Sequence, residues 1–373
     1  MSRSSFRPRA APTVLLAAVL VLLLPYGRLA PDGRHAGERP PGVPSGFFTG
    51  SDEAGVRRIA QVQAWLGGGA LTVGHTYLPG DRWSNIEGHP ALFGPWARWK
   101  EERPGRLFVL NVPLLDRSEA GLSDAEVRDG LRRGAQGAFD GHFRTLGERL
   151  VEHRLGDAVL VPGWEMNGTT YSHRCGPDPE AWKAYWRRTV EVLRAVPGQR
   201  FRFDFTPSRG RDAVPWPLCY PGDDVVDVIG MDAYDQPEGL SFEGQVNEEY
   251  GLAHHVRFAA EHGKPVSYPE WGLFRNGDNP AYVRGMLDWF AVHRPVYQTV
   301  TDYCPHGVWE CPDNPESARV VRGALGGRPG AGAEGAPQGP FPWVASEEGE
   351  GVGGAQAGDR AQAQGAGGDL ERG

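Results

Sequence analysis

The feature that most constrains this chain is an alternation of short apolar runs with longer segments of helical character. The runs have the length and the β-branched or aromatic content of strands. Eight runs occur, at 45–50, 70–77, 106–115, 157–165, 200–208, 225–234, 264–272 and 296–303. Strands that alternate with helices form parallel βα units, so eight units over this length predict an α/β fold, a single-domain (β/α)8 TIM barrel.

The segments between the runs have helical periodicity or a helix-forming composition. They lie at 52–65, 91–101, 123–154, 178–195, 246–262, 279–292 and 315–324. The clearest spans 124–155 and places six apolar side chains near one face, namely Val127, Leu131, Phe139, Phe143, Leu146 and Leu150. A doubly wound open sheet is the alternative, but no Gly-rich phosphate loop follows the first run to favour it.

The first 30 residues have the pattern of a secretory signal peptide. Arg3, Arg7 and Arg9 precede the apolar run 13–24, and a Pro-rich stretch follows. The run is shorter than the about 20 apolar residues that span a membrane. We therefore expect a secreted protein, with an uncleaved membrane anchor as the alternative.

The remaining boundaries follow from composition. Residues 31–44 are a predicted linker, and 326–373 are Gly, Ala, Gln and acidic residues with little to bury, which predicts a disordered tail. This leaves 45–325 as the catalytic domain, about the size of one barrel. The formal net charge is -8, and no basic block follows the signal. Nucleic-acid binding is therefore not expected.

Four cysteines fit an exported, disulfide-bonded protein. They are Cys175, Cys219, Cys304 and Cys311. Zinc is the competing interpretation, but no C-x-x-C occurs and the four residues are far apart in sequence. Of the three possible pairings, the predicted loops favour Cys175 with Cys219, which follow neighbouring strands, and Cys304 with Cys311, which share one loop.

Two glutamates mark a candidate active site. Glu165 closes the fourth run in "LVPGWEMNG", and Glu270 closes the seventh in "VSYPEWG". The active face of such a barrel is formed by the carboxyl ends of its strands, so the two carboxylates are expected to face each other. Retaining glycoside hydrolysis needs such a pair, since one carboxyl protonates the leaving oxygen while the other attacks the anomeric carbon.

The motifs "PGWEMNG", "GMDAYD" and "KPVSYPEWG" resemble glycoside hydrolase family 26, the β-mannanase family of a large retaining (β/α)8 clan. The resemblance implies that Glu165 is the acid/base, that Glu270 is the nucleophile and that Tyr234 hydrogen-bonds the nucleophile. This chain departs from the family pattern at Trp164, where the family usually has His and the wider clan has Asn. That residue normally contacts the sugar, so the substrate of this chain is not fixed by the resemblance.

Other residues are predicted to contact substrate because they lie next to the two glutamates or near the ends of predicted strands. Flat indoles complement the apolar faces of sugar rings, and an apolar neighbour would raise the pKa of Glu165. The predicted substrate-binding residues are Trp164, Asn167, Tyr234, Trp271, His75 and Asp232. Asn111, Asp204 and Asp232 are alternatively buried polar layers of the barrel. Further aromatic residues expected in the loops, mostly as packing residues, are Trp83, Trp96, Trp99, Trp216, Phe274 and Trp309.

Two other function classes remain as alternatives. A non-catalytic carbohydrate-binding surface protein on the same fold would keep the aromatics but would not need both carboxylates. A metal-dependent hydrolase would need clustered His and Asp ligands, and His254 and His255 are neighbours on a predicted helix that point to different sides. We therefore expect no cofactor and no metal, a polysaccharide or oligosaccharide substrate, no stable membrane insertion and a monomer.

Overall fold

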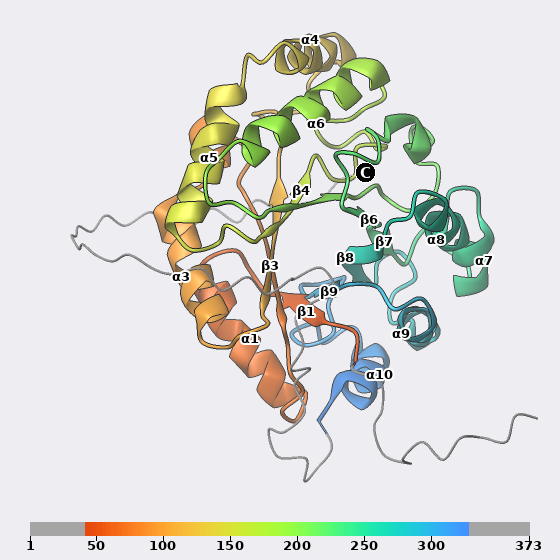
Figure 1. Cartoon of the computed structure of the whole chain (residues 1–373). Coiled ribbons are helices and arrows are strands. Elements are labelled where there is room, and N and C mark those ends of the chain that lie inside the picture. The colour runs from red at the N-terminus through yellow and green to blue at the C-terminus, as the bar shows by residue number, and fades with distance from the viewer. Residues whose placement is uncertain (1–41, 328–373) are drawn as a thin grey trace, which may run out of the picture. The chain divides into compact units, whose positions relative to one another are not determined.

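The computed structural model describes residues 42–327. The predicted signal peptide, most of the predicted linker and nearly all of the predicted tail lie outside this range. The described residues contain nine strand segments, drawn in Figure 1. They are β1 (Ser45–Phe48), β2 (Val73–Tyr77), β3 (Leu107–Val112), β4 (Val159–Pro162), β5 (Arg202–Phe205), β6 (Val228–Gly230), β7 (Ala233–Tyr234), β8 (Val266–Gly272) and β9 (Gln298–Thr301).

The strands close into a barrel. They pair in the order β6-β5-β4-β3-β2-β1-β9-β8-β7, and β6 also pairs with β8. Because β6 and β7 both pair with β8 and are separated by two residues, they form one barrel strand, and the barrel has eight strands. Every pairing is parallel, including the one that joins β1 to β9. The predicted (β/α)8 barrel is therefore confirmed.

Helices surround the strands (Figure 1). They are α1 (Glu53–Trp65), α2 (Trp83–Ile86), α3 (Pro90–Glu101), α4 (Asp124–Ala135), α5 (Asp140–Glu152), α6 (Pro179–Arg194), α7 (Phe242–Asn247), α8 (Leu252–Glu261), α9 (Pro280–His293) and α10 (Pro315–Leu325), with the 3-10 helix η1 (Trp216–Cys219). Local sequence explains their ends. For example, Ser123 and Glu126 form a reciprocal capping box at the start of α4, which satisfies two of its free N–H groups.

Two predicted helical segments are each divided in the structure. The segment 124–155 breaks between α4 and α5, where Gly137 adopts a φ of 87°. The segment 246–262 contains the end of α7 and then α8, and Tyr250 between them has a φ of 63°. A left-handed residue cannot continue a right-handed helix, so each segment has to reverse and restart.

Apolar side chains pack on both sides of the strands. Between strands and helices lies a large core that includes Phe47, Phe108, Leu160 and Trp186. A smaller cluster combines Trp164 with residues of four strands and with two residues that precede β9, namely Val73, Leu107, Val109, Val159, Val161, Val228, Val296 and Tyr297. Layers of inward-facing strand residues fill the interior of such a barrel. Among residues 42–327, no helix is long and apolar enough to cross a membrane.

Candidate active site

Glu165 lies beyond β4, not at its last position as predicted. Two residues separate it from Pro162, and its φ is 50°, in the left-handed region that non-glycine residues rarely adopt. The main-chain N–H of Glu165 donates to the carbonyl of Thr206, just after β5, at 2.8 Å. This bond to the neighbouring strand holds the residue in its unfavourable conformation, and such conformations cluster at functional sites.

Glu270 lies within β8 and is only 6% exposed. Three side chains hydrogen-bond its carboxylate. Asn111 Nδ2 donates to Oε1 at 3.0 Å, the Tyr234 hydroxyl donates to Oε2 at 2.7 Å, and the Tyr77 hydroxyl also contributes. Tyr234 therefore makes the contact expected of it. Donors around a buried carboxylate favour its charged form, which suits a nucleophile.

The two carboxyl groups influence each other. Burial, then the negative charge of Glu270, raises the pKa of Glu165 to about 8. Burial also raises the pKa of Glu270, but its hydrogen bonds from Tyr234, Tyr77 and Asn111 counteract this. The environments thus favour the proton on Glu165 over Glu270, which separates an acid from a nucleophile.

His75 contacts Asn111, and its predicted contact with substrate stays a prediction. It is fully buried in the middle of β2, and its Nε2 lies 3.0 Å from Asn111 Oδ1. Burial lowers the pKa of His75 to about 4, so the ring is neutral at pH 7. Its neutral N–H donates to the Asn111 carbonyl and turns the amide N–H group toward Glu270. His75 is therefore a positioning residue.

Asn167 is also used for positioning. Its side chain is fully buried and accepts from the Ser208 N–H at 2.9 Å while donating to the Ser208 carbonyl at 3.0 Å. Each end of the amide makes one hydrogen bond to Ser208, and the predicted contact with substrate stays a prediction. The pair of bonds fixes the loop after β5 beside Glu165, whose carboxylate is hydrogen-bonded by Ser208.

The two tryptophans next to the carboxylates face different ways. Side chains alternate along a strand, and with Glu270 inside the barrel Trp271 points outward, where it packs on Tyr282 and Phe290 of α9. The prediction that Trp271 lines the site is therefore wrong. Trp164 instead belongs to the interior cluster and packs against Tyr77 and Tyr171 at centroid distances of 5.8 and 4.8 Å.

Asp232 lies between β6 and β7 and is 1% exposed. Neither carboxyl oxygen has a hydrogen-bond partner among the described residues. Burial, followed by the charges of Glu270 and Glu165, raises the pKa of Asp232 well above its ordinary value. An unpartnered buried carboxyl is costly, so the site retains a polar group with free bonding capacity beside both glutamates. Asp204, by contrast, is a buried structural residue bonded by Ser267 and Tyr297.

Two aromatic residues near the site were not predicted. Tyr77 bonds Glu270 from the end of β2, and its place at the end of an apolar run was the available signal. Tyr303, next to Cys304, is 45% exposed, and partial burial, followed by the charges of Glu270 and Glu165, raises its pKa to about 12. An exposed ring beside the carboxylates is a suitable surface for a sugar face.

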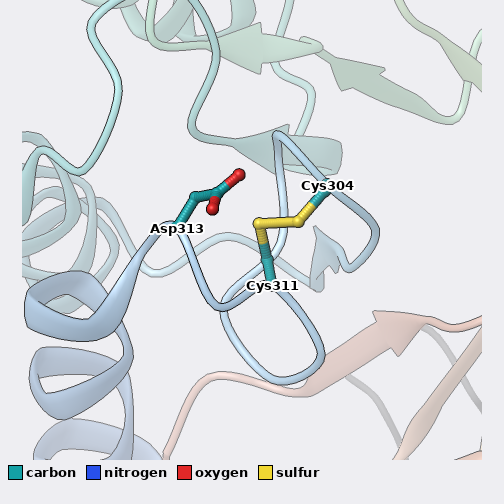
Figure 2. A group of neighbouring side chains, drawn as sticks. All are labelled: Cys304, Cys311 and Asp313. Atoms are coloured by element: carbon teal, nitrogen blue, oxygen red, sulfur yellow. A yellow bond between two sulfur atoms is a disulfide. The ribbon is translucent and has the colours of Figure 1, made fainter.

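The cysteines pair as predicted. Cys175 joins Cys219, and Cys304 joins Cys311. The first bridge ties the segment after Glu165 to η1. Figure 2 shows the second bridge with Asp313 beside it. These three residues have a spacing that would suit a metal ion, but both sulfurs are bonded to each other and cannot act as thiolate ligands.

The predicted difference between His254 and His255 is confirmed. His255 is buried and its Nε2 lies 2.9 Å from the Ile229 carbonyl, whereas His254 is partly exposed beside Trp216. The two rings do not share a ligand position.

Part of the chain is similar to a known protein family. Residues 159–264 match the model of glycosyl hydrolase family 26. The match includes Glu165 and Tyr234 and ends just before β8, which carries Glu270. The resemblance inferred from the three motifs is therefore confirmed. No curated protein matches the sequence.

Solved structures share the fold. A mannanase from Bacillus subtilis aligns with a TM-score of 0.57 at 13% identity, covering 76% of this chain and 85% of that chain. A family 26 β-mannanase from Bacteroides ovatus gives a TM-score of 0.57 at 17% identity, covering 76% and 89%. A modular endo-β-1,4-mannanase from Cellulomonas fimi gives 0.52 at 19% identity, covering 70% and 65%. At these identities the alignments establish the barrel fold.

Proposed function

We propose that this family 26-like glycoside hydrolase cleaves β-glycosidic bonds of a polysaccharide by a retaining double displacement. The observation that carries the proposal is the asymmetric pair of carboxyl groups. Glu165 has a pKa raised to about 8, and Glu270 beside it accepts hydrogen bonds from Asn111, Tyr234 and Tyr77. A neutral acid beside a hydrogen-bonded carboxylate is the requirement of this chemistry.

In the first step, the Glu270 carboxylate attacks the anomeric carbon and forms a covalent glycosyl ester. Glu165 gives its proton to the departing glycosidic oxygen, so that no free alkoxide has to form. Formation of the ester removes the negative charge of Glu270, and the pKa of Glu165 then falls. Glu165 is thereby converted into a base for the second step.

In the second step, Glu165 takes a proton from a water molecule, which attacks the same anomeric carbon and releases Glu270. Two displacements at one carbon retain its configuration. The donors from Asn111 and Tyr234 stabilise the carboxylate as it leaves. No metal or cofactor is required for either step.

The substrate class we favour is a mannan or a related β-glycan. The structures in the comparison are described as mannanases, and the matched family is a glycosyl hydrolase family. Trp164 places an indole at the position where that family usually has His, so the polar group at this position of the chain is an indole N–H instead of an imidazole. We further propose that the enzyme is secreted, which the apolar run 13–24 and the two disulfides support.

The test is hydrolysis of a panel of mannan, mixed-linkage glucan and xylan, with products separated by chromatography. Glu270→Ala is expected to abolish turnover, whereas Glu165→Ala should spare aryl glycosides whose leaving group needs no proton. Glu191→Ala, an exposed glutamate of α6, is the matched control. A fully active Glu270 variant, product of inverted configuration, or loss of activity on treatment with a chelator would contradict the proposal.

A further inference from the structure

Asp232 is a buried carboxyl group that the proposed reaction does not use. It lies in the short link between β6 and β7, two positions before Tyr234. Side chains alternate along a strand, so Asp232 points to the same side as Tyr234, whose hydroxyl donates to Glu270. Asp232 is 1% exposed, and the charges of Glu270 and Glu165 both act on it. A third carboxyl group therefore lies beside the two glutamates.

The barrel interior holds another aspartate, which is bonded very differently. Asp204 of β5 is also fully buried. It accepts hydrogen bonds from Ser267 and Tyr297 at 2.6 Å each and from Thr206 at 2.9 Å. These three donors favour a charged carboxylate. Neither oxygen of Asp232 has a hydrogen-bond partner among the described residues, so the fold gives a charge at this position none of that support.

The charges that act on Asp232 are all negative. Burial raises its pKa, and the charges of Glu270, Glu165 and Asp204, in that order, raise it further. These three groups belong to β8, to the segment after β4 and to β5. The one influence that favours the charged form of Asp232 is the main-chain N–H of Glu270, and it is the weakest. Ionisation would therefore place a second charge next to existing charges of the same sign.

The cation nearest to Asp232 in the sequence is directed elsewhere. Arg209 donates its main-chain N–H to the Asp232 carbonyl at 2.9 Å. Its guanidinium donates to the main-chain carbonyls of Tyr234 and Gln236 and forms an ion pair with Glu248. No positive group among residues 42–327 contributes to the pKa of Asp232. A buried charge without a partner is costly, so the neutral form is favoured.

Three tyrosine hydroxyls near Asp232 donate to other carboxylates. They belong to Tyr77, Tyr234 and Tyr297, and the charge of Asp232 contributes to raising the pKa of each. The first two bond Glu270, and the third bonds Asp204. A carboxyl group without a donor can hydrogen-bond its oxygen neighbours only by donating, and for this it needs its own proton.

We propose that Asp232 works as a neutral acid, whose O–H group stabilises the negative charge that Glu270 and Glu165 carry in turn. The inference rests on the proposed function, in which formation of the glycosyl ester moves this charge from Glu270 to Glu165 and hydrolysis of the ester returns it. Because Asp232 lies beside both glutamates, its O–H can turn toward either one. Asp232 keeps its proton throughout the reaction and acts through the two glutamates, as a positioning residue.

The first test is the pH dependence of stability in Asp232→Asn. An aspartate that is neutral in the folded protein ionises on unfolding above about pH 4, so the parent loses stability as the pH rises. The amide has a similar shape and no proton to lose. In urea unfolding, the ratio of folded to unfolded variant should rise relative to that of the parent by up to about tenfold for each pH unit above about 4.

The matched control for this test is Asp288→Asn, at an exposed aspartate of α9. Water solvates an exposed carboxylate in the folded and the unfolded chain alike. The stability of the Asp288→Asn variant relative to the parent should therefore not change with pH.

The second test is kinetic. Asn offers an N–H donor where the protonated carboxyl offers O–H, so Asp232→Asn should keep a kcat/KM close to that of the parent and leave the basic limb of the pH profile in place. Asp232→Leu keeps a branched side chain but has no donor. Because a hydrogen bond to a charged group is a strong one, kcat of this variant should fall by about ten- to a hundredfold.

Three results would overturn the proposal. A relative stability of Asp232→Asn that does not change with pH, or a basic limb that moves to lower pH in this variant, would show that Asp232 is ionised. Equal losses of activity in Asp232→Asn and Asp232→Leu would show that the carboxyl transfers its proton. Parent-like activity of Asp232→Leu would show that Asp232 stabilises no charge.

The stability test also separates this inference from the proposed function, because it needs no substrate. If the parent hydrolyses no polysaccharide of the panel while the relative stability of Asp232→Asn still rises with pH, the glycosidase proposal fails and the neutral state of Asp232 stands. The same measurement decides the protonation state if Asp232→Leu does not fold.

Discussion

Burial and hydrogen bonding together decide which of the two glutamates ionises first. Both lose solvation, but Glu270 gains three hydrogen bonds to its charged form and Glu165 gains one from Ser208. The more strongly bonded carboxylate ionises first, and its charge then raises the pKa of the other. The division therefore also depends on residues that do not bond the carboxylates themselves, such as His75, which orients Asn111.

This division predicts the pH dependence of kcat/KM. The acid limb reports ionisation of Glu270, and the basic limb reports loss of the Glu165 proton near pH 8. In Tyr234→Phe, Glu270 loses a donor that lowers its pKa, so the pKa rises and the acid limb moves to higher pH. A hydrogen bond to a charged group contributes about 1.5–3 kcal/mol, which is about one to two pH units.

The control for this experiment is Tyr268→Phe. Tyr268 is a buried tyrosine whose hydroxyl contacts Trp289 and His255 instead of the carboxylates. The acid limb of the Tyr268→Phe variant should match that of the parent. An acid limb that stays in place in Tyr234→Phe would show that the Tyr234 hydroxyl does not control the ionisation of Glu270.

At the scale of elements, periodicity located the strands but not the orientation of every residue. All eight barrel strands lie within the predicted runs because each run is a short, buried apolar segment. Trp271 was misplaced because its closeness to Glu270 in sequence was given more weight than the alternation of side chains along β8. The hydrogen bonds of Asn167 were not predicted because its partner, Ser208, lies 41 residues later and no local pattern indicates it.

Periodicity also failed to predict the breaks within helical segments. Val127 and Leu131 of α4, and Phe143 and Leu146 of α5, all face the core, so the apolar pattern continues through the break at Gly137. The break depends on one backbone angle, which composition does not determine. The disulfides, in contrast, were predictable, because the order of the strands around a barrel places successive loops side by side.

The two disulfides should contribute unequally to stability. Cys175 and Cys219 are 44 residues apart, and Cys304 and Cys311 are 7 apart. On the chain-entropy model these loops correspond to about 4 and about 2.5 kcal/mol. We expect Cys175→Ala/Cys219→Ala to lower the midpoint of thermal unfolding more than Cys304→Ala/Cys311→Ala, as measured by calorimetry. The reverse order would mean that the contacts of the short loop outweigh chain entropy.

For the whole molecule, the barrel is complete within the described residues. β1 closes it by pairing with β2 on one side and with β9 on the other. The Gln298 N–H also donates to the Pro44 carbonyl, and the Gly327 N–H donates to that of Leu66. The first and last described segments are thus both bonded to the barrel, and Phe47 of β1 is fully buried in the core.

This closure predicts how far the chain can be shortened. A protein of residues 42–327 should unfold cooperatively and keep the kcat/KM of the full chain on a short oligosaccharide, because every residue of the candidate site lies within it. A protein of residues 50–327 lacks β1, so the edges of β2 and β9 are unpaired and the core loses Phe47. We expect it to aggregate or to lack the near-ultraviolet circular dichroism of packed aromatic side chains. Cooperative unfolding of the 50–327 protein, or an inactive 42–327 protein, would show that the barrel is not the unit that folds and acts.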